Sequence, residues 1–200
     1  MTQDTHAKAP DSPAPWVLWL DERLIGPGAR AADRVTCYGT AAAGSVLATV
    51  LLAMDADPSW ISTTVVAVVA FDLFGGAAVN ATAAAKRQFH RPGRTARHHL
   101  GFVAGHVQPF LLALAVPGFG WGAAAVVYAI VLGGAVVVTA VPGEVRRPAA
   151  FGVTVLAVAA ATPVAVPDEL AWLAPVLCVK LLIGHLLPES WPPSRRESRV

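Results

Sequence analysis

Long apolar runs recur along this chain at nearly regular intervals, and they constrain its fold more than any other feature. Short stretches rich in proline, glycine or charged residues separate the runs. About 20 mostly apolar residues suffice for a helix to cross the hydrocarbon core of a bilayer. The sequence therefore predicts six transmembrane helices. Their ranges are 35–54, 60–85, 99–116, 121–141, 149–166 and 170–187.

The composition supports an integral membrane protein. Only 14% of the 200 residues are charged and 55% are hydrophobic, whereas soluble domains carry about 25% charged residues. The chain has too little polar surface to coat a globule in water. We therefore expect an all-α, multi-pass protein of the cell membrane with lipids as neighbours. The net charge of +2 does not indicate a nucleic-acid partner.

The basic residues predict the orientation of the helices. Lys and Arg in short loops mark the cytoplasmic side of a membrane protein. Fourteen of the 15 fall in the terminal segments or in the loops after the second and fourth runs, and the exception is Lys180. The other three loops contain no Lys or Arg, and the charged residues there are Asp55, Asp57, Asp168 and Glu169. This alternation predicts six spans with both termini in the cytoplasm.

Four parts of the chain are expected. Residues 1–15 are polar and rich in proline, which is typical of a disordered tail. Residues 16–33 contain two Trp beside charges and predict a segment at the cytoplasmic surface, either an aromatic anchor or a lid. Residues 34–188 form the six-helix domain, and 189–200 form a basic cytoplasmic tail.

Asp72 lies near the middle of the second run. An ionisable side chain at that depth costs about 2.5–3.5 kcal/mol on insertion scales, so it needs a reason to be there. Gly75 and Gly76 follow it and remove side-chain bulk, which lets another helix or a ligand approach. Asn80 comes further along the same run. Asp72 is either a functional acid or a polar group that fixes helix packing.

Lys180 in the last run lies at a depth similar to that of Asp72. Two opposite charges in an apolar medium favour an ion pair, and such a pair can be purely structural. If the pair does not form, Asp72 is expected to keep its proton, because apolar surroundings disfavour a charged carboxylate. The sequence leaves both alternatives open.

Histidines in the third run are the next candidates. His99 and His106 are seven residues apart and are expected on one face of a continuous helix. Metal-binding membrane enzymes with histidine ligands use many more than the six in this chain. We therefore expect hydrogen bonding to Asp72, to a substrate or across helices, with neither metal nor cofactor. The basic residues within 86–97 suit lipid headgroups or, alternatively, a phosphate-bearing substrate.

These residues predict an enzyme that acts on a lipophilic small molecule within the bilayer. Asp72 would be the general acid, with Asn80 and His106 as further catalytic residues. Such an acid can protonate an alkene or epoxide, and aromatic faces stabilise the resulting carbocation. The expected substrate-binding residues are Phe71, Phe74, Phe89, His99, Phe102, Gln108 and Phe110.

In size, span number and a single intramembrane acid, residues 35–187 resemble the small integral-membrane terpene cyclases, including bacterial ones that cyclise prenylated indoles. The resemblance rests on architecture and on Asp72. It implies metal-free cyclisation of an isoprenoid-bearing substrate, an isomerase or lyase type of reaction. Fungal members of that class carry acids on more than one helix, whereas here Asp72 is the clear intramembrane acid.

Two other functions fit the same residues. A proton-coupled transporter or small channel would use Asp72, His106 and Lys180 as a relay, with His185 as a further member. A membrane scaffold would use the polar groups for packing alone. An enzyme predicts an enclosed, aromatic-lined cavity that reaches Asp72, and a transporter predicts a polar path that continues toward the other face. A scaffold predicts an Asp72 whose bonds are all made to protein partners, with no cavity.

Overall fold

The computed structural model describes residues 19, 22, 24–55 and 57–188, and every regular element in this part of the chain is helical. The tails predicted at 1–15 and 189–200 lie outside the described residues. So do six residues of the surface segment predicted at 16–33. The all-helical class expected from the apolar runs is confirmed for the described part.

Within the part of the chain that the structure describes, three helices are long and apolar enough to cross a membrane: α2 (Ala31–Asp55), α3 (Trp60–Ala81) and α7 (Trp121–Ala140). Polar groups mark where α3 starts and where it stops. Ser59 Oγ accepts the backbone N–H of Ser62 at 3.1 Å and caps the start. At the other end, Thr82 turns the chain into the next short helix.

The remaining predicted runs are built from shorter helical pieces. The third run contains two helices, the fifth contains one helix of 16 residues, and the sixth passes from a 3₁₀ turn into α-helix and then π-helix. A continuous helix through the third run was therefore a wrong prediction. The elements are α4 (Ala83–Phe89), α5 (Ala96–Ala104), α6 (Gln108–Ala115), α8 (Arg146–Ala161), η1 (Asp168–Leu170), α9 (Leu173–Cys178) and η2 (Val179–His185).

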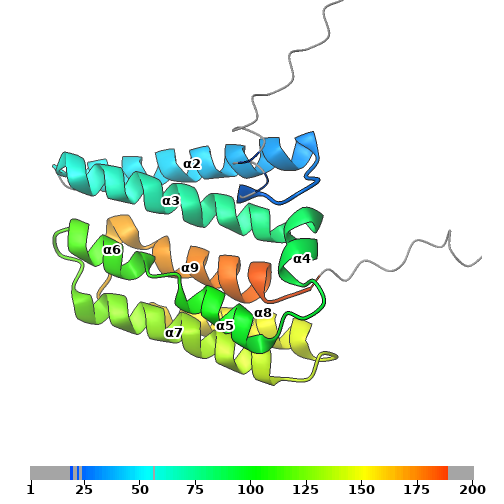
Figure 1. The fold of residues 1–200 in the computed structure, drawn as a ribbon. Helices are drawn as coiled ribbons and strands as arrows, with labels where there is room; N and C mark the ends of the chain where they lie inside the picture. Colours follow the sequence, from blue (N-terminus) through cyan, green and yellow to red (C-terminus); the bar gives the residue numbers. More distant parts are fainter. Residues whose placement is uncertain (1–18, 20–21, 23, 56, 189–200) are drawn as a thin grey trace, which may run out of the picture.

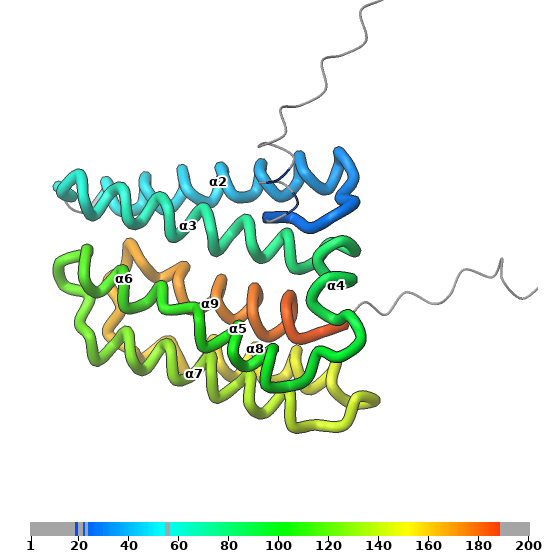
Figure 2. The backbone as a smooth tube through the Cα atoms, in the orientation of Figure 1, coloured from blue at the N-terminus to red at the C-terminus, as the bar shows by residue number. Residues whose placement is uncertain are grey.

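The helices form a layered bundle with the last segment inside it (Figure 1). The pair α2 and α3 makes one layer, and α7 lies with α8 in the opposite layer. The α9–η2 segment runs between these layers and packs against α3, α7 and α8. The tube view shows α6 and α5 following one another along the same direction as α3 and α7 (Figure 2).

Small residues allow α2 and α3 to pack closely. A Cβ on Gly44 would lie 2.2 Å from Cγ of Phe74, and one on Gly75 would lie 2.6 Å from Cβ of Ala41. Real atoms do not approach so closely, so only glycine fits at these two positions. Part of the expectation for the Gly75–Gly76 pair is thus confirmed, since a neighbouring helix occupies the space beside Gly75.

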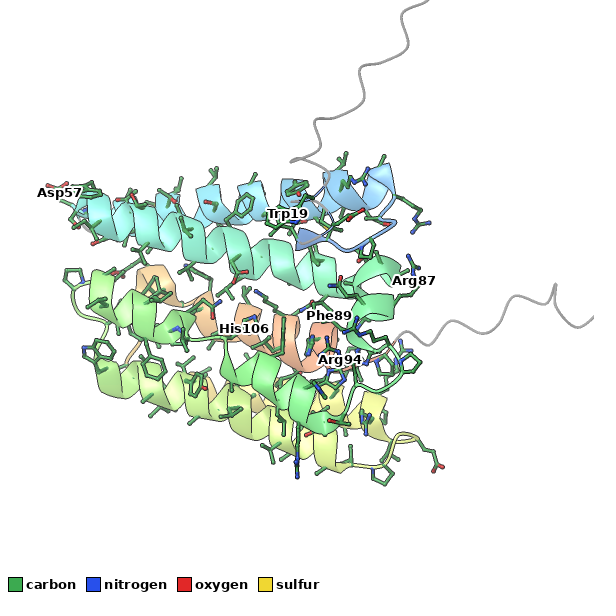
Figure 3. The ribbon with its side chains drawn as sticks, viewed as in Figure 1. Trp19, Asp57, Arg87, Phe89, Arg94 and His106 are labelled. Atoms are coloured by element: carbon green, nitrogen blue, oxygen red, sulfur yellow. The ribbon has the colours of Figure 1, made fainter. Side chains whose placement is uncertain are left out.

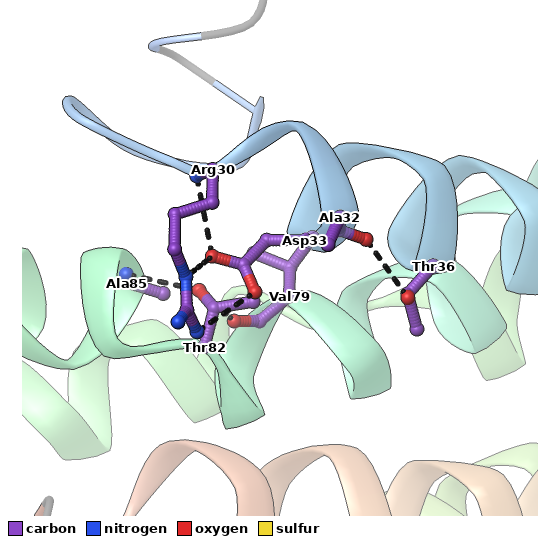
Figure 4. A network of polar contacts seen from close by, with 7 residues as sticks. All are labelled: Arg30, Ala32, Asp33, Thr36, Val79, Thr82 and Ala85. Atoms are coloured by element: carbon purple, nitrogen blue, oxygen red, sulfur yellow. Dashed lines mark hydrogen bonds and ion pairs between the residues drawn. The ribbon is translucent and has the colours of Figure 1, made fainter.

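A second, smaller contact fixes the segment before α2. Ile25 is buried with Cys37 and Ala84. Arg30 donates through its Nε and its backbone N–H to Oδ2 of Asp33, both at 3.2 Å (Figure 4). The carboxylate of Asp33 therefore links the first turn of α2 to Arg30, the residue just before it.

The ends of the bundle differ in charge. Arg87 and Arg94 lie at one end, and Asp57 lies at the opposite end (Figure 3). Both arginines belong to the predicted cytoplasmic loop, and Asp57 belongs to a predicted external loop. These two arginines therefore lie at the end of the bundle opposite to Asp57.

Candidate functional site

Asp72 and Lys180 form an ion pair between α3 and η2. Lys180 Nζ lies 2.9 Å from Oδ2 of Asp72 and also donates to the Asp72 backbone carbonyl at 3.2 Å. The Lys180 side chain is 4% exposed, whereas that of Asp72 is 50% exposed. The pairing alternative is confirmed, so Asp72 is not the isolated proton donor that an unpaired carboxyl group would be.

Gly76 makes room for this pair. A Cβ on Gly76 would lie 2.5 Å from Cε of Lys180 and 2.7 Å from its Nζ. The lysine side chain therefore crosses the surface of α3 where a glycine leaves space. The approach expected at this glycine is made by the buried lysine of the last helix.

Asn80 binds the backbone that carries Lys180. Its Nδ2 donates to the carbonyl of Lys180 at 3.1 Å, and the Asn80 residue is 3% exposed. The π-helical stretch η2 begins one residue before Lys180. This hydrogen bond joins α3 to η2, so Asn80 positions the lysine rather than contacting the carboxylate of Asp72.

Gln108 reaches Asp72 because the helix breaks just before it. Pro109 has no N–H and its ring would clash with the carbonyl one turn earlier, which ends a helix. α5 stops at Ala104 and α6 starts at Gln108. The Nε2 of Gln108 then donates to Oδ2 of Asp72 at 2.8 Å.

The backbone groups freed by this break find side-chain partners. His106 Nδ1 lies 2.8 Å from the carbonyl of Phe102, and the hydroxyl of Tyr128 donates to the carbonyl of Ala104 at 2.8 Å. His106 lies at the break (Figure 3). His106 and His99 therefore do not share one helix face, and the placement expected from a continuous helix is wrong.

A hollow of about 150 Å³ opens beside the Asp72 carboxylate. Tyr38 and Phe71 supply aromatic walls, and Ile25 closes it from the segment before α2. Asp72 Oδ2 accepts both hydrogen bonds described above, and no described residue donates to its Oδ1.

The other aromatic residues expected to bind substrate lie in different places. Phe74 packs against Trp172 with ring centroids 5.6 Å apart, and Phe110 packs against Trp121 and Tyr128. Of the residues predicted for the site, the structure brings Phe71 and Gln108 to Asp72 and places Phe74 and Phe110 in the bundle packing.

Phe89, Phe102 and His99 join a cluster around His185. The rings of Phe102 and His185 are stacked with centroids 3.9 Å apart, and Phe89 meets the His185 ring edge-on. His99 Nδ1 lies 3.2 Å from His185 Nε2. The Nδ1 of His185 is buried without a hydrogen-bond partner.

His90 completes this histidine cluster from the loop after α4. Its Nε2 lies 2.9 Å from the carbonyl of His185, and its ring stacks on His99. Burial lowers the pKa of His90 below its ordinary value of 6.5, and the nearby cations Lys86 and Arg146 add to this effect. No described set of three or more His, Cys, Asp or Glu is arranged to hold a metal ion.

Two functional features had weak sequence signals. Tyr38 lies on α2, seven residues after the start of that helix, and only the packing of α2 on α3 brings it to Asp72. The role of Gln108 as a partner of Asp72 depends on the break, which the neighbouring Pro109 could have indicated.

Comparisons with models of protein families, with curated proteins and with solved structures found no match for this chain.

Proposed function

We propose that the chain crosses the cell membrane six times with both termini in the cytoplasm. Three helices meet the length of a span by themselves. The α5–α6, α8 and α9–η2 segments run beside them along the same direction (Figure 1). The separation of Arg87 and Arg94 from Asp57 agrees with the rule that basic loops face the cytoplasm.

We further propose that this protein is a membrane-embedded enzyme that cyclises a lipophilic, isoprenoid-bearing substrate without a metal. One observation carries the proposal: the Asp72 carboxylate is half exposed at an apolar hollow while a buried ammonium group stands behind it. Exclusion of water from such a site protects a carbocation from being quenched. Phe71 and Tyr38 line the same hollow, and aromatic rings can stabilise a nearby cation.

The ion pair holds the proton that the reaction needs. In the proposed step, a proton passes from Lys180 Nζ to Asp72 Oδ2 across their hydrogen bond of 2.9 Å and leaves an uncharged amine and an uncharged acid. The acid then protonates the alkene or epoxide of the substrate, and the carbocation closes the ring. The proton that the cation releases returns to the amine. The product is an isomer, so no co-reactant is consumed.

The hollow fits the reacting end of a long chain. Its volume of about 150 Å³ is below the 300–1,000 Å³ typical of pockets for drug-sized ligands. The remainder of the substrate would lie among lipid tails along α2 and α3. Gln108 binds Oδ2 of Asp72 and leaves the other carboxylate oxygen for the substrate.

The test uses membranes that contain the full-length protein and a farnesylated indole as the probe. We expect a cyclised isomer that gains one deuterium when the reaction runs in deuterium oxide. Asp72→Asn should lower turnover per folded protein by at least about 100-fold, the usual range for loss of a general acid. Asp57→Asn, in a loop at the far end of the bundle, is the matched control.

Full activity of Asp72→Asn would contradict the acid role. A protein that moves protons across sealed vesicles without changing the probe would instead support the relay through Asp72, His106 and Lys180. Within the described residues the His106 ring bonds to Phe102 and not to Asp72 or Lys180, so such a relay would need groups beyond the hydrogen bonds seen here.

A further inference from the structure

The hollow beside Asp72 has two unlike ends. The α3 residues that line it run from Phe71 and Asp72 to Val79. Val79 packs against the buried cluster that contains Ile25, and Ile25 also lines the hollow. At a rise of about 1.5 Å per residue, Val79 lies about 10 Å along the helix from Asp72. The carboxylate is therefore at one end of the hollow and Ile25 is at the other.

The turn before α2 fixes Ile25 in this position. Ile25 is 1% exposed and is buried with Cys37 of α2 and Ala84 of α4. The next residue, Gly26, has a φ of +110°, in the left-handed region that favours glycine. A Cβ on Gly26 would lie 3.2 Å from the carbonyl carbon of Ala84. Because the turn packs directly on α4, the side chain of Ile25 forms an end wall of the hollow.

The opening of the hollow is on the outside of the bundle. Leu24, Tyr38 and Phe71 line the hollow and are also exposed. Residues with both properties lie where a cavity meets its surroundings. The pair α2 and α3 forms an outer layer of the bundle (Figure 1). In the proposed membrane orientation the opening therefore faces lipid tails.

The size and the polarity of the hollow limit what can lie inside it. Among the described residues that line it, Asp72 has the one charged side chain. The volume is about 150 Å³, and an apolar cavity of about 150 Å³ holds a molecule the size of benzene. The space between Asp72 and Ile25 therefore fits a branched apolar group of about the same size, such as one isoprene unit.

We propose that Ile25 is a specificity-determining residue, which limits the chain end that binds beside Asp72 to the size of one isoprene unit. This inference rests on the proposed function for the identity of the ligand, the end of an isoprenoid chain. The end of the chain lies against Ile25 with its last double bond at the carboxylate, and the rest of the chain leaves through the opening. A bulkier end group meets the side chain of Ile25 and is excluded.

Two unreactive probes measure this size limit. Both are indoles with the same saturated chain, which ends in an isopropyl group in one probe and in a naphthyl group in the other. The tritium-labelled isopropyl probe is bound to the full-length protein in lipid nanodiscs, and either unlabelled probe displaces it. We expect the isopropyl probe to bind at least about tenfold more tightly than the naphthyl probe, a ratio that hydrophobic pockets achieve.

Shortening the end wall should relax this selectivity. We expect Ile25→Ala to bind the naphthyl probe about tenfold more tightly than the parent protein does, because the hollow then extends toward α4. Ile130→Ala in α7 is the matched control, since Ile130 packs against the core and does not line the hollow. It should leave the ratio of the two affinities unchanged.

Thermal unfolding identifies any variant that has lost its fold. If Ile25→Ala has, Ile25→Val serves, and it should change the ratio in the same direction by a smaller factor. A ratio that the Ile25 variants leave unchanged would overturn the proposal, and so would a parent protein that shows no saturable binding of the isopropyl probe. An equal change in Ile130→Ala would show that loosened packing, and not the end wall, relaxes the selectivity.

The binding experiment and the cyclisation assay can fail separately, because neither probe can be cyclised. Selective binding that Ile25→Ala relaxes, without cyclisation of the farnesylated indole, would refute the proposed reaction and leave the size limit in place. Cyclisation of the farnesylated indole by a protein whose selectivity does not depend on Ile25 would refute the size limit alone.

Discussion

The ion pair of Asp72 and Lys180 depends on a glycine, which contributes space and no side chain. Gly76 leaves the space through which the lysine passes. Opposite charges at similar depth made the pair predictable from the sequence. The direction of approach was not predictable, because it depends on how η2 lies against α3.

Replacing this glycine tests the packing of the pair. Gly76→Ala places a Cβ 2.5 Å from Lys180 Cε, so we expect the ammonium to be displaced and the protein to lose about 1–3 kcal/mol of stability, as for other overpacked sites. Gly133→Ala in α7 is the control, since a Cβ there meets nothing within 4 Å. Thermal unfolding in detergent measures both, and equal melting temperatures would contradict the prediction.

His90 gives the protein a dependence on pH. Its pKa in the folded state is lowered from 6.5, mainly by burial, so the unfolded chain binds more protons at mildly acidic pH. Stability from this group is fully present above pH 6.5 and is lost as the pH falls from 6.5 toward the lowered value.

We therefore expect the free energy of unfolding to decrease between pH 7 and pH 5 and this slope to be smaller in His90→Gln. His98→Gln is the control, because the His98 ring bonds to exposed Thr95 outside the cluster. Denaturant titration at several pH values measures the slope. A slope that is the same in both variants would mean that His90 is not responsible.

At the scale of elements, Asn80 of α3 fixes the position of η2, the π-helical end of the last segment. This residue was a catalytic candidate in the sequence because it follows Asp72 on the same run. The hydrogen bond to the carbonyl of Lys180 gives it a positioning role, through which it acts on the ion pair.

Asn80→Ala should cost about 1–3 kcal/mol of stability, because it leaves a buried carbonyl without its partner. It should also lower turnover of the farnesylated indole much less than Asp72→Asn does. Unfolding measurements and product yield per folded protein are compared in the same membranes. If Asn80→Ala lost as much activity as Asp72→Asn while its stability stayed unchanged, the result would show that Asn80 is a catalytic residue.

The broken third run shows where sequence periodicity stops being informative. Apolar residues continue through 99–116 without a charged residue, which favours one helix. Pro109 removes one backbone hydrogen bond, and Phe102 and Ala104 carbonyls are then satisfied by His106 and Tyr128. Those partners come together only in the folded bundle, so the position of Gln108 beside Asp72 could not follow from spacing alone.

At the scale of the whole molecule, the helical class predicted from the sequence is confirmed for the described residues, and the six spans and their orientation stay predictions. Apolar length and loop charge are local properties that the membrane selects directly. Of the residues predicted for the site, Gln108 bonds to Asp72 and Phe71 lines the hollow beside it, and their functional roles stay predictions. Phe74 and Phe110 do not lie at Asp72. An aromatic residue in an apolar helix can equally well serve packing, and the neighbouring helices decide which of these two roles it has.

The six-span topology predicts which loops a reagent can reach from outside the cell. Asp57→Cys should react with a membrane-impermeant maleimide in intact cells, and Arg94→Cys should react only after the cells are opened. Cys37 and Cys178 are buried, so the parent protein supplies the background. Labelling of both sites in intact cells would contradict the predicted orientation.

The two partners of the ion pair are 108 residues apart in the chain. During synthesis, which proceeds at about 5–20 residues per second, the segment that carries the carboxylate is therefore made several seconds before the lysine leaves the ribosome. In that interval the Asp72 carboxylate has no Lys180 ammonium group with which to form the ion pair. A nascent chain that ends before the last segment would expose this polar group to lipid, which makes it a recognisable target for membrane quality-control proteases.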